Sequence, residues 1–344
     1  MSPFEHHMYV LECGDGSLYT GYATDVAARV AAHAAGKGAR YTKAHPPVRL
    51  VAQARFFSKQ RAMSAEARFK RLSRAEKDQL LRLAASEPLE DVLCRELPGF
   101  GDDSAQEFVC RSLARHAEEG FARFQASLIP NVDAWTIVGV RTSELRRIAR
   151  ELVRRDDADG FLGAPPHRFF EEMQVHAFAI GLERDYDAAL WRCEAFLPYV
   201  DNWATCDQLP IKALAERPEE TLVKVGEWLS TNRCYIMRFA IRVLMVHYLG
   251  ERFEPRYLDM VAAAHLTGGE ESPVSVDDTY YLNMMRAWYF AEALVWQPER
   301  ALPYLERRGT GAPLDEWTRR KAIQKAIESR RIPASMKDQL RGYR

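Results

Sequence analysis

The sequence lacks the markers of several large protein classes. Its six cysteines form no CxxC pair, and their spacing suits neither a zinc site nor a compact disulfide framework. No apolar run approaches the ~18 residues of a membrane span, and residues 1–7 show neither the basic nor the apolar region of a signal peptide. A glycine-rich phosphate-binding loop is also absent. These absences predict a cytoplasmic protein with reduced thiols and without a bound nucleotide cofactor.

The chain also has a net charge of zero, because 48 Lys and Arg residues balance 48 Asp and Glu residues over its 344 residues. The average conceals an asymmetry: residues 1–85 carry 14 basic against 7 acidic side chains, whereas residues 86–107 carry 1 against 7. A basic module followed by an acidic connector predicts that the front of the chain meets a polyanion. A solvated surface of mixed sign explains the same counts equally well.

Composition along the chain predicts three parts. The segment 84–104 holds two prolines, two glycines and most of the acid excess, which is typical of a linker with one helical turn. We therefore predict a small α/β domain over residues 1–83, an acidic linker over 84–104 and an all-α domain over 105–344.

The first part reads as a β-hairpin followed by helices and a third strand. Gly14 to Ser17 is a strong turn signal between two strand-like runs. Ser73 to Glu76 fits a capping box that opens a last helix. The expected elements are strands over 8–13, 18–22 and 48–56, a helix over 26–35, a basic loop over 36–43, and a helix that begins at Ser58.

Four residues of this part could handle a phosphodiester. The hairpin places Tyr9 and Tyr19 on neighbouring strands, and Arg29 and Glu66 follow on helices. A phenol can relay or accept a proton, and a guanidinium can hold phosphate oxygens in a bidentate fork. A glutamate can hold a Mg²⁺ ion that neutralises developing charge. By spacing alone, buried strand tyrosines and a surface arginine remain the alternative explanation.

Residues 8–82 resemble the GIY-YIG endonucleases, in particular their small single-domain bacterial branch. His7-Met8-Tyr9 stands for GIY and Tyr19-Thr20-Gly21 for YIG, and the similarity continues through Gly36-Lys37-Gly38-Ala39 and Pro47-Val48-Arg49-Leu50. The resemblance implies that Tyr9 and Tyr19 line the scissile phosphate, that Arg29 stabilises it, that His33 assists proton transfer and that Glu66 ligates the metal. Tyr22-Ala23 departs from the family pattern, because a small hydroxyl usually present there is missing.

From about residue 105 onward the pattern predicts helix after helix and no strand. The run 140–154 is amphipathic, with Leu145, Ile148, Ala149 and Leu152 expected to face inward. Short helices joined by recurring turns favour an α-solenoid. Its later helices are expected near 187–196, 202–213, 219–229, 233–248, 255–265, 278–295, 299–307, 316–329 and 334–341.

Four residues of the helical part could form a site for a cationic base. In a helix Trp203 and Asp207 share a face, while Arg238 and Trp288 each lie in an otherwise apolar helical run. An aromatic face and a carboxylate can together hold a cation. The alternative is structural: two core tryptophans, and an Asp207–Arg238 salt bridge.

Residues 121–342 are similar to the AlkD-like DNA alkylation repair glycosylases. Gly139-Val140-Arg141-Thr142, the run 198–207, Arg238-Phe239-Ala240-Ile241 and the run 280–288 carry the resemblance, and the loop 266–277 looks like an addition. It implies a HEAT-like solenoid whose concave side cradles duplex DNA, with Trp203, Asp207, Arg238 and Trp288 as site residues and no cofactor. Arg238 is then expected to hold a backbone phosphate.

Together these observations predict a DNA repair protein with two activities. The helical domain would excise N3- or N7-alkylated purines from duplex DNA, and the first domain would cut a phosphodiester with Mg²⁺. One alternative is a non-catalytic DNA-binding scaffold that delivers a structure-specific nuclease to damaged or branched DNA. Another is a HEAT-type protein-interaction module with a degenerate nuclease.

Overall fold

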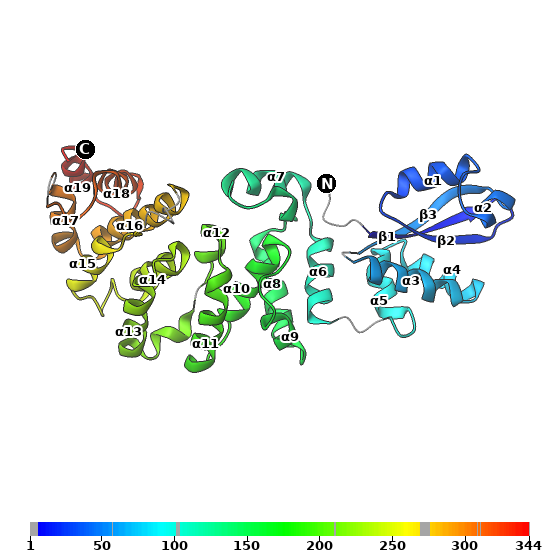
Figure 1. Ribbon diagram of the computed structural model, residues 1–344, viewed down its shortest axis with the longest axis horizontal. Helices are drawn as coiled ribbons and strands as arrows, with labels where there is room; N and C mark the ends of the chain where they lie inside the picture. Colours follow the sequence, from blue (N-terminus) through cyan, green and yellow to red (C-terminus); the bar gives the residue numbers. More distant parts are fainter. Residues whose placement is uncertain are drawn as a thin grey trace. The chain divides into compact units, whose positions relative to one another are not determined.

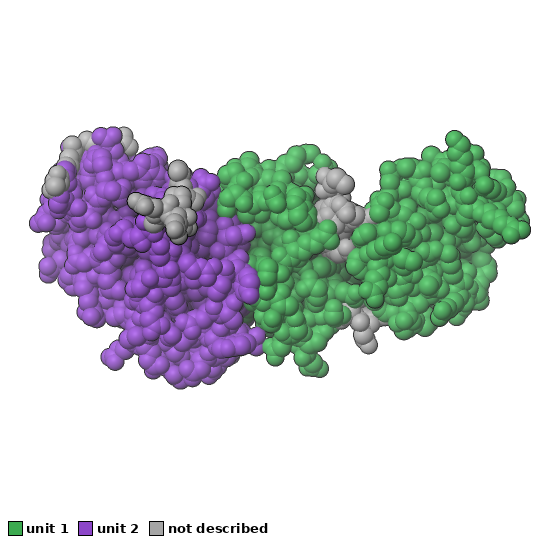
Figure 2. Space-filling model, in the orientation of Figure 1, with its two compact units in different colours: residues 1–179 green, residues 180–344 purple. Residues whose placement is uncertain are grey.

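A computed structural model of the chain describes residues 6–56, 58–100, 104–209, 211–268, 276–307, 309 and 311–343. The chain forms two compact units, residues 1–179 and 180–344, which Figure 2 colours separately. Each is described by itself. Most of the expected added loop 266–277 lies outside the described residues. Within the described residues, no helix has both the length and the apolar character required to span a bilayer.

A three-stranded antiparallel sheet opens the first unit (Figure 1). Its central strand β1 (His6–Cys13) pairs with β2 (Leu18–Ala23) on one side and with β3 (Pro47–Phe56) on the other. The predicted hairpin turn is confirmed: the Asp15 carboxylate accepts hydrogen bonds from the backbone N–H and hydroxyl of Ser17. The pairing places Tyr9 opposite Gly21, which becomes important for the site.

Helices pack on this sheet where the sequence predicts them, with one exception. The Ser58 side chain caps α3, and Ser73 and Glu76 form the predicted capping box of α4. The exception is the expected basic loop 36–43, whose second half is the short helix α2. The bounds are α1 (Val26–Ala34), α2 (Arg40–Ala44), α3 (Lys59–Arg71) and α4 (Arg74–Leu83).

The segment predicted as a linker contains more structure than one helical turn. Helix α5 (Leu89–Glu96) packs against α4 and β3, and its apolar residues join a core cluster with Met8 and Phe69. The carboxylate of Glu90 is buried and forms an ion pair with Arg55 on β3. The amphipathic spacing of Leu89, Val92, Leu93 and Leu97 explains this packing, because it places all four on one helix face. The boundaries at residues 83 and 104 themselves stay a prediction.

The described residues of the first unit after α5 are helical, as expected. Leu145, Ile148, Ala149 and Leu152 of α8 are all buried, which confirms the predicted inward face. They share a core with α6 and with Phe161 of α9. The bounds are α6 (Ala105–Arg115), α7 (Glu119–Leu128), the 3-10 turn Ala134–Thr136, α8 (Thr142–Leu152), α9 (Ala158–Leu162) and α10 (Phe170–Ile180), which reaches the unit boundary.

The second unit is a succession of helices packed side by side. Helix α13 packs on α14, α14 on α16, and α16 on both α17 and α18 (Figure 1). The chain therefore has the predicted fold class, a small α/β domain followed by a helical array. The bounds are α11 (Tyr186–Phe196), α12 (Trp203–Cys206), α13 (Pro218–Leu229), α14 (Cys234–His247), α15 (Arg256–Ala263), α16 (Val276–Trp296), α17 (Pro298–Glu306), α18 (Glu316–Glu328) and α19 (Ala334–Arg341), with 3-10 turns at Leu197–Tyr199 and Lys212–Ala215.

The helix expected over 202–213 is shorter than predicted. Helix α12 ends at Cys206, and a separate 3-10 turn begins at Lys212. Asp207 still has helical backbone angles, and its N–H donates to the carbonyl oxygen of Trp203. The expected face shared by Trp203 and Asp207 therefore survives on a single helical turn.

Candidate active sites

A hydrogen-bonded chain joins Tyr9 of β1 to His33 of α1 and Thr42 of α2. The Tyr9 hydroxyl lies 2.9 Å from His33 Nε2, and His33 Nδ1 lies 2.6 Å from Thr42 Oγ1. The Thr42 hydroxyl donates to the carbonyl oxygen of Ala39, so its oxygen accepts from Nδ1–H. Nε2 is then unprotonated and accepts the Tyr9 proton. In this arrangement the Tyr9 hydroxyl donates to His33 Nε2.

Aromatic rings surround this chain. The Tyr19 ring lies 6.3 Å from that of Tyr9 and 5.0 Å from the imidazole of His33. On its other side the half-exposed Tyr41 ring stacks on Tyr19 at 6.2 Å. The structure thus brings together the predicted residues Tyr9, Tyr19 and His33, and adds Thr42 and Tyr41 from a segment expected to be a loop.

Two glycines make room for the site. A Cβ atom on Gly21 would lie 2.4 Å from the Tyr9 hydroxyl, and one on Gly38 would lie 2.1 Å from His33 Nδ1. Both distances are far below van der Waals contact. The glycines of the two motifs that carry the family resemblance therefore allow Tyr9 and His33 to occupy their positions.

Burial and Arg29 set the proton affinities of the site. Burial raises the pKa of Tyr9 to about 12, while a hydrogen bond and the charge of Arg29 oppose this rise. Burial also lowers the pKa of His33 below its usual 6.5, and the nearby Arg29 charge lowers it further. Arg29 is itself solvent-exposed at the side of the phenols. The site therefore favours a neutral imidazole and places a cation where a phenolate or phosphate would need one.

Glu66 of α3 lies outside this chain of contacts. Its side chain is mostly buried, and its polar contact in the described part of the protein is a 2.5 Å ion pair with Lys70, one turn further on. The described residues contain no cluster of three or more His, Cys, Asp or Glu side chains suited to a metal ion.

The second candidate site centres on Asp207 and Arg238. Asn202 caps α12 by accepting from the N–H of Thr205, which fixes the turn that ends at Asp207. Arg238 Nε and Nη2 donate to the two carboxylate oxygens of Asp207 at 2.9 and 2.7 Å, and Nη1 donates to the carbonyl oxygen of Tyr281 at 2.6 Å. Arg238 thereby connects α12, α14 and α16.

This bidentate pair is buried, with 6% of the Arg238 side chain and 13% of the Asp207 side chain exposed. Burial alone would lower the pKa of Arg238, but the Asp207 carboxylate outweighs burial and raises it. The salt bridge that the sequence allowed as an alternative is therefore present. The phosphate contact expected of Arg238 stays a prediction.

The two predicted tryptophans are half-buried, and neither belongs to the fully buried core. Trp203 begins α12, one turn before Asp207. Trp288 lies on α16, where the guanidinium of Arg242 sits 5.2 Å from its ring centre. Arg242 follows Arg238 by one turn of α14, so spacing alone could have identified it as a neighbour of the site.

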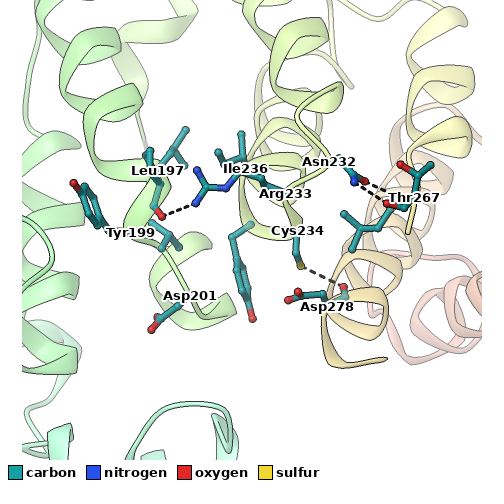
Figure 3. A pocket seen from close by; sticks show the side chains of 13 residues that line it. Leu197, Tyr199, Asp201, Asn232, Arg233, Cys234, Ile236, Thr267 and Asp278 are labelled. Atoms are coloured by element: carbon teal, nitrogen blue, oxygen red, sulfur yellow. Dashed lines mark hydrogen bonds between the residues drawn. The ribbon is translucent and has the colours of Figure 1, made fainter. Parts of the chain in front are cut away.

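A polar pocket of about 550 Å³ opens at the N-terminal end of α14 (Figure 3). Arg233 donates to the carbonyl oxygen of Pro198, and the Cys234 thiol donates to that of Asp278. Figure 3 shows the carboxylates of Asp201 and Asp278 at its edge. None of the predicted site residues lines it, although Cys234 lies one turn before Arg238.

Two family models match the chain. The GIY-YIG catalytic domain matches residues 5–79, and the DNA alkylation repair enzyme family matches residues 109–265. The second match contains Trp203, Asp207 and Arg238 but ends before Trp288.

Curated relatives of high identity match the N-terminal part of the chain. A UPF0213 protein of Streptococcus sanguinis is 63% identical over 71 residues, which is 21% of this chain and 82% of the relative. A UPF0213 protein of Halobacterium salinarum is 56% identical over 75 residues, covering 22% of this chain and 97% of the relative.

Among solved structures, the solution NMR structure of a UPF0213 protein from Bacillus halodurans is 52% identical, covers 25% of this chain and 90% of its own, and has a TM-score of 0.17. The identity and coverage of the relatives agree with the family match over residues 5–79. The chain therefore belongs to the GIY-YIG family through its N-terminal domain, and its residues 109–265 match the DNA alkylation repair enzyme family.

Proposed function

We propose that the protein excises cationic N3- or N7-alkylated purines from duplex DNA with its helical domain and cuts a phosphodiester with its GIY-YIG domain. The observation that carries the first half is the buried, bidentate Asp207–Arg238 pair within the residues that match DNA alkylation repair enzymes. Both families are enzymatic and both act in the repair or cleavage of DNA. The six cysteines are reduced and buried, in keeping with a cytoplasmic location.

The glycosylase step rests on charge. An alkylated purine is a cationic leaving group, and the deoxyribose becomes cation-like as the glycosidic bond breaks. The Asp207 carboxylate stabilises that sugar and orients the water that traps it. A unit charge pair at 4 Å is worth ~4 kcal/mol at an effective dielectric constant of 20, which corresponds to about a thousandfold in rate. Trp203 and Trp288 supply aromatic faces that favour the cationic nucleotide by ~0.5–2 kcal/mol.

Arg238 modifies this account. Because it compensates the Asp207 charge, the carboxylate acts on the substrate less strongly than an unpaired one would. The two hydrogen bonds that Arg238 donates also fix the orientation of the Asp207 carboxylate. Arg238 is therefore a positioning residue for Asp207 in addition to the phosphate contact proposed for it.

The nuclease step rests on the Tyr9–His33 chain. A water molecule attacks phosphorus, its proton passes to Tyr9, and the Tyr9 proton passes to His33 Nε2. The new P–O bond forms as the bond to the leaving sugar oxygen breaks, and that oxygen takes up a proton from solvent water. Arg29 stabilises the charge on Tyr9 and on the phosphate, while Tyr19 lines the same face.

Glu66 fits a Mg²⁺ ion, because Mg²⁺ is usually held by one or two carboxylates and completes its coordination with water and substrate phosphates. When bound, the ion would neutralise charge on the phosphate. Lys70 holds the Glu66 carboxylate until then.

Base release from a duplex with a single 7-methylguanine tests the glycosylase half. We expect the wild-type protein to produce alkali-labile sites without Mg²⁺. Asp207→Asn should lower the rate of base release about a hundredfold to a thousandfold, and its amide oxygen can still accept a hydrogen bond from Arg238. DNA affinity of the variant should be unchanged. An intact protein that binds this duplex and releases no base would contradict the assignment.

The scaffold alternative draws on one specific observation. Since Arg238 already neutralises Asp207, the pair could serve only to tie α12 to α14. A scaffold predicts DNA binding without base release in the wild-type protein, and Asp207→Asn would then change stability alone.

A further inference from the structure

One face of α18 carries an aromatic side chain followed by two lysines. Trp317, Lys321 and Lys325 are spaced four residues apart, so they lie along one line of the helix with their attachment points about 6 Å apart. We call these three residues the α18 stripe. It lies beyond the residues that match the family model, and none of its members was among the predicted site residues.

The two lysines of the stripe are available cations. Lys321 Nζ lies 6.0 Å from the Trp317 ring centre and 3.1 Å from Gln324 Oε1, and neither Lys321 nor Lys325 forms an ion pair with a described carboxylate. Their helix neighbours differ, since Arg319 and Arg320 both pair with Glu316. The charges of the stripe are therefore not consumed within the part of the protein that the structure describes.

The aromatic end of the stripe is exposed. Trp317 is 38% exposed, and its ring meets the 46% exposed ring of Tyr280 edge to face at 5.5 Å. Tyr280 in turn contacts Tyr281, the residue whose carbonyl oxygen accepts from Arg238. Exposed rings of this size beside cations are typical of surfaces that meet nucleic-acid bases and phosphates.

The other end of the stripe is electrostatically coupled to the candidate glycosylase site. Helix α18 packs on α16, which carries Trp288. Burial lowers the pKa of the half-buried Lys325, and the Arg238 charge lowers it further, whereas the Glu328 and Asp207 carboxylates oppose this shift. The stripe therefore begins at an exposed aromatic pair, and its last lysine is influenced by the charges of the Asp207–Arg238 pair.

We propose that the α18 stripe binds the backbone of one strand of the duplex beside the lesion, with Lys321 and Lys325 on phosphates and Trp317, supported by Tyr280, packed against a deoxyribose. The occupant is DNA because the stripe offers cations and aromatic faces together. This inference rests on the proposed function of the helical domain. The stripe would hold the lesion-bearing DNA strand in register with the glycosylase site.

The salt dependence of DNA binding tests whether the α18 stripe contacts DNA. The full chain is titrated with a fluorescent undamaged duplex over a range of salt concentrations. Lys321→Ala and Lys325→Ala should each reduce the slope of log affinity against log salt by about 1, and the double variant by about 2. Trp317→Ala should weaken binding about 10-fold through lost apolar contact with the backbone, and Trp317→Phe should restore most of the loss. Lys224→Ala is the matched control, because that lysine of α13 already forms ion pairs with Glu194 and Glu227. The slope of this variant should equal that of the wild-type protein.

Base release from the 7-methylguanine duplex is measured in parallel, so that the two proposals fail separately. Unchanged slopes in the double variant overturn the stripe, and they are also the result expected if an acidic protein surface is its true occupant. Reduced slopes without any base release support the stripe as a DNA surface and remove the glycosylase assignment. If Trp317→Ala loses helical structure by circular dichroism, the lysine variants and Trp317→Phe still decide the question.

Discussion

Single residues decide the chemistry of both sites, and Gly21 shows how. Its motif position is opposite Tyr9 on the neighbouring strand, and a side chain there would collide with the phenol. The pairing of β1 with β2 therefore translates a short sequence motif into the position of one hydroxyl group. The same relation holds between Gly38 and His33.

Gly21→Ala is expected to abolish nicking. The new methyl group would lie 2.4 Å from the Tyr9 hydroxyl, so Tyr9 would have to move and lose its hydrogen bond to His33. Gly120→Ala is the control, because a Cβ at that position meets nothing within 4 Å. The measurement is the rate at which each variant nicks duplex DNA in the presence of Mg²⁺. A wild-type rate for Gly21→Ala would show that Tyr9 is not held as described.

His167 gives the first unit a pH-dependent stability. Its ring stacks on Phe161 at 4.0 Å, and burial lowers its pKa from 6.5 to about 4. Below pH 6.5 the unfolded chain binds a proton that the folded chain refuses, so this stability is complete above pH 6.5 and is lost as the pH falls toward 4. The loss amounts to about 3 kcal/mol at most.

Urea unfolding at pH 7.5 and pH 5.0 checks the His167 effect. The wild-type protein should lose more free energy of unfolding between the two pH values than His167→Phe, which keeps the stacked ring and removes the proton site. His265→Gln should behave as wild type, since His265 is exposed. Equal losses in wild type and His167→Phe would rule out this origin of the pH dependence.

At the scale of elements, α5 shows that acidic composition does not make a segment a linker. Its apolar face enters the core of the N-terminal domain, while Glu90 pairs with Arg55. Composition records the average charge of the segment, whereas packing depends on the spacing of its leucines and valine. The short helix α12 shows the same distinction, because one capped turn is enough to fix Asp207.

Leu93→Ala should therefore destabilise the N-terminal domain. Leu93 is fully buried, and removing its side chain from a packed core costs about 2–5 kcal/mol. Val223→Ala, at a position 64% exposed, is the control and should cost little. Thermal or urea unfolding would measure both, and a Leu93→Ala protein as stable as wild type would return α5 to the status of a linker.

At the scale of the whole molecule, two DNA-directed domains on one chain suggest action in series. Excision of a base leaves an abasic site, and cleavage of the adjacent phosphodiester would be the next step. The hypothesis is motivated by the shared chain and by the two family matches.

Separation-of-function variants test the series. With Mg²⁺ and a 7-methylguanine duplex, the wild-type protein should give strand breaks, whereas Tyr9→Phe should stop at alkali-labile sites. Asp207→Asn should leave the lesion duplex intact yet cut a duplex that already contains an abasic site. If wild-type protein with Mg²⁺ leaves abasic sites uncut, the two domains do not act in sequence.

Local sequence determined several features of this protein, namely the hairpin, the capping box, the inward face of α8 and the family motifs. Each depends on residues close together in the chain, so their spacing was enough to predict it. The tertiary structure alone decided what depends on distant residues. It placed α5 in a core and brought Thr42 and Tyr41 to the phenols. It also formed the Asp207–Arg238 salt bridge across 31 residues, which the sequence offered only as an alternative. Burial and long-range pairing set the charge that each site presents, and neither is visible in a one-dimensional pattern.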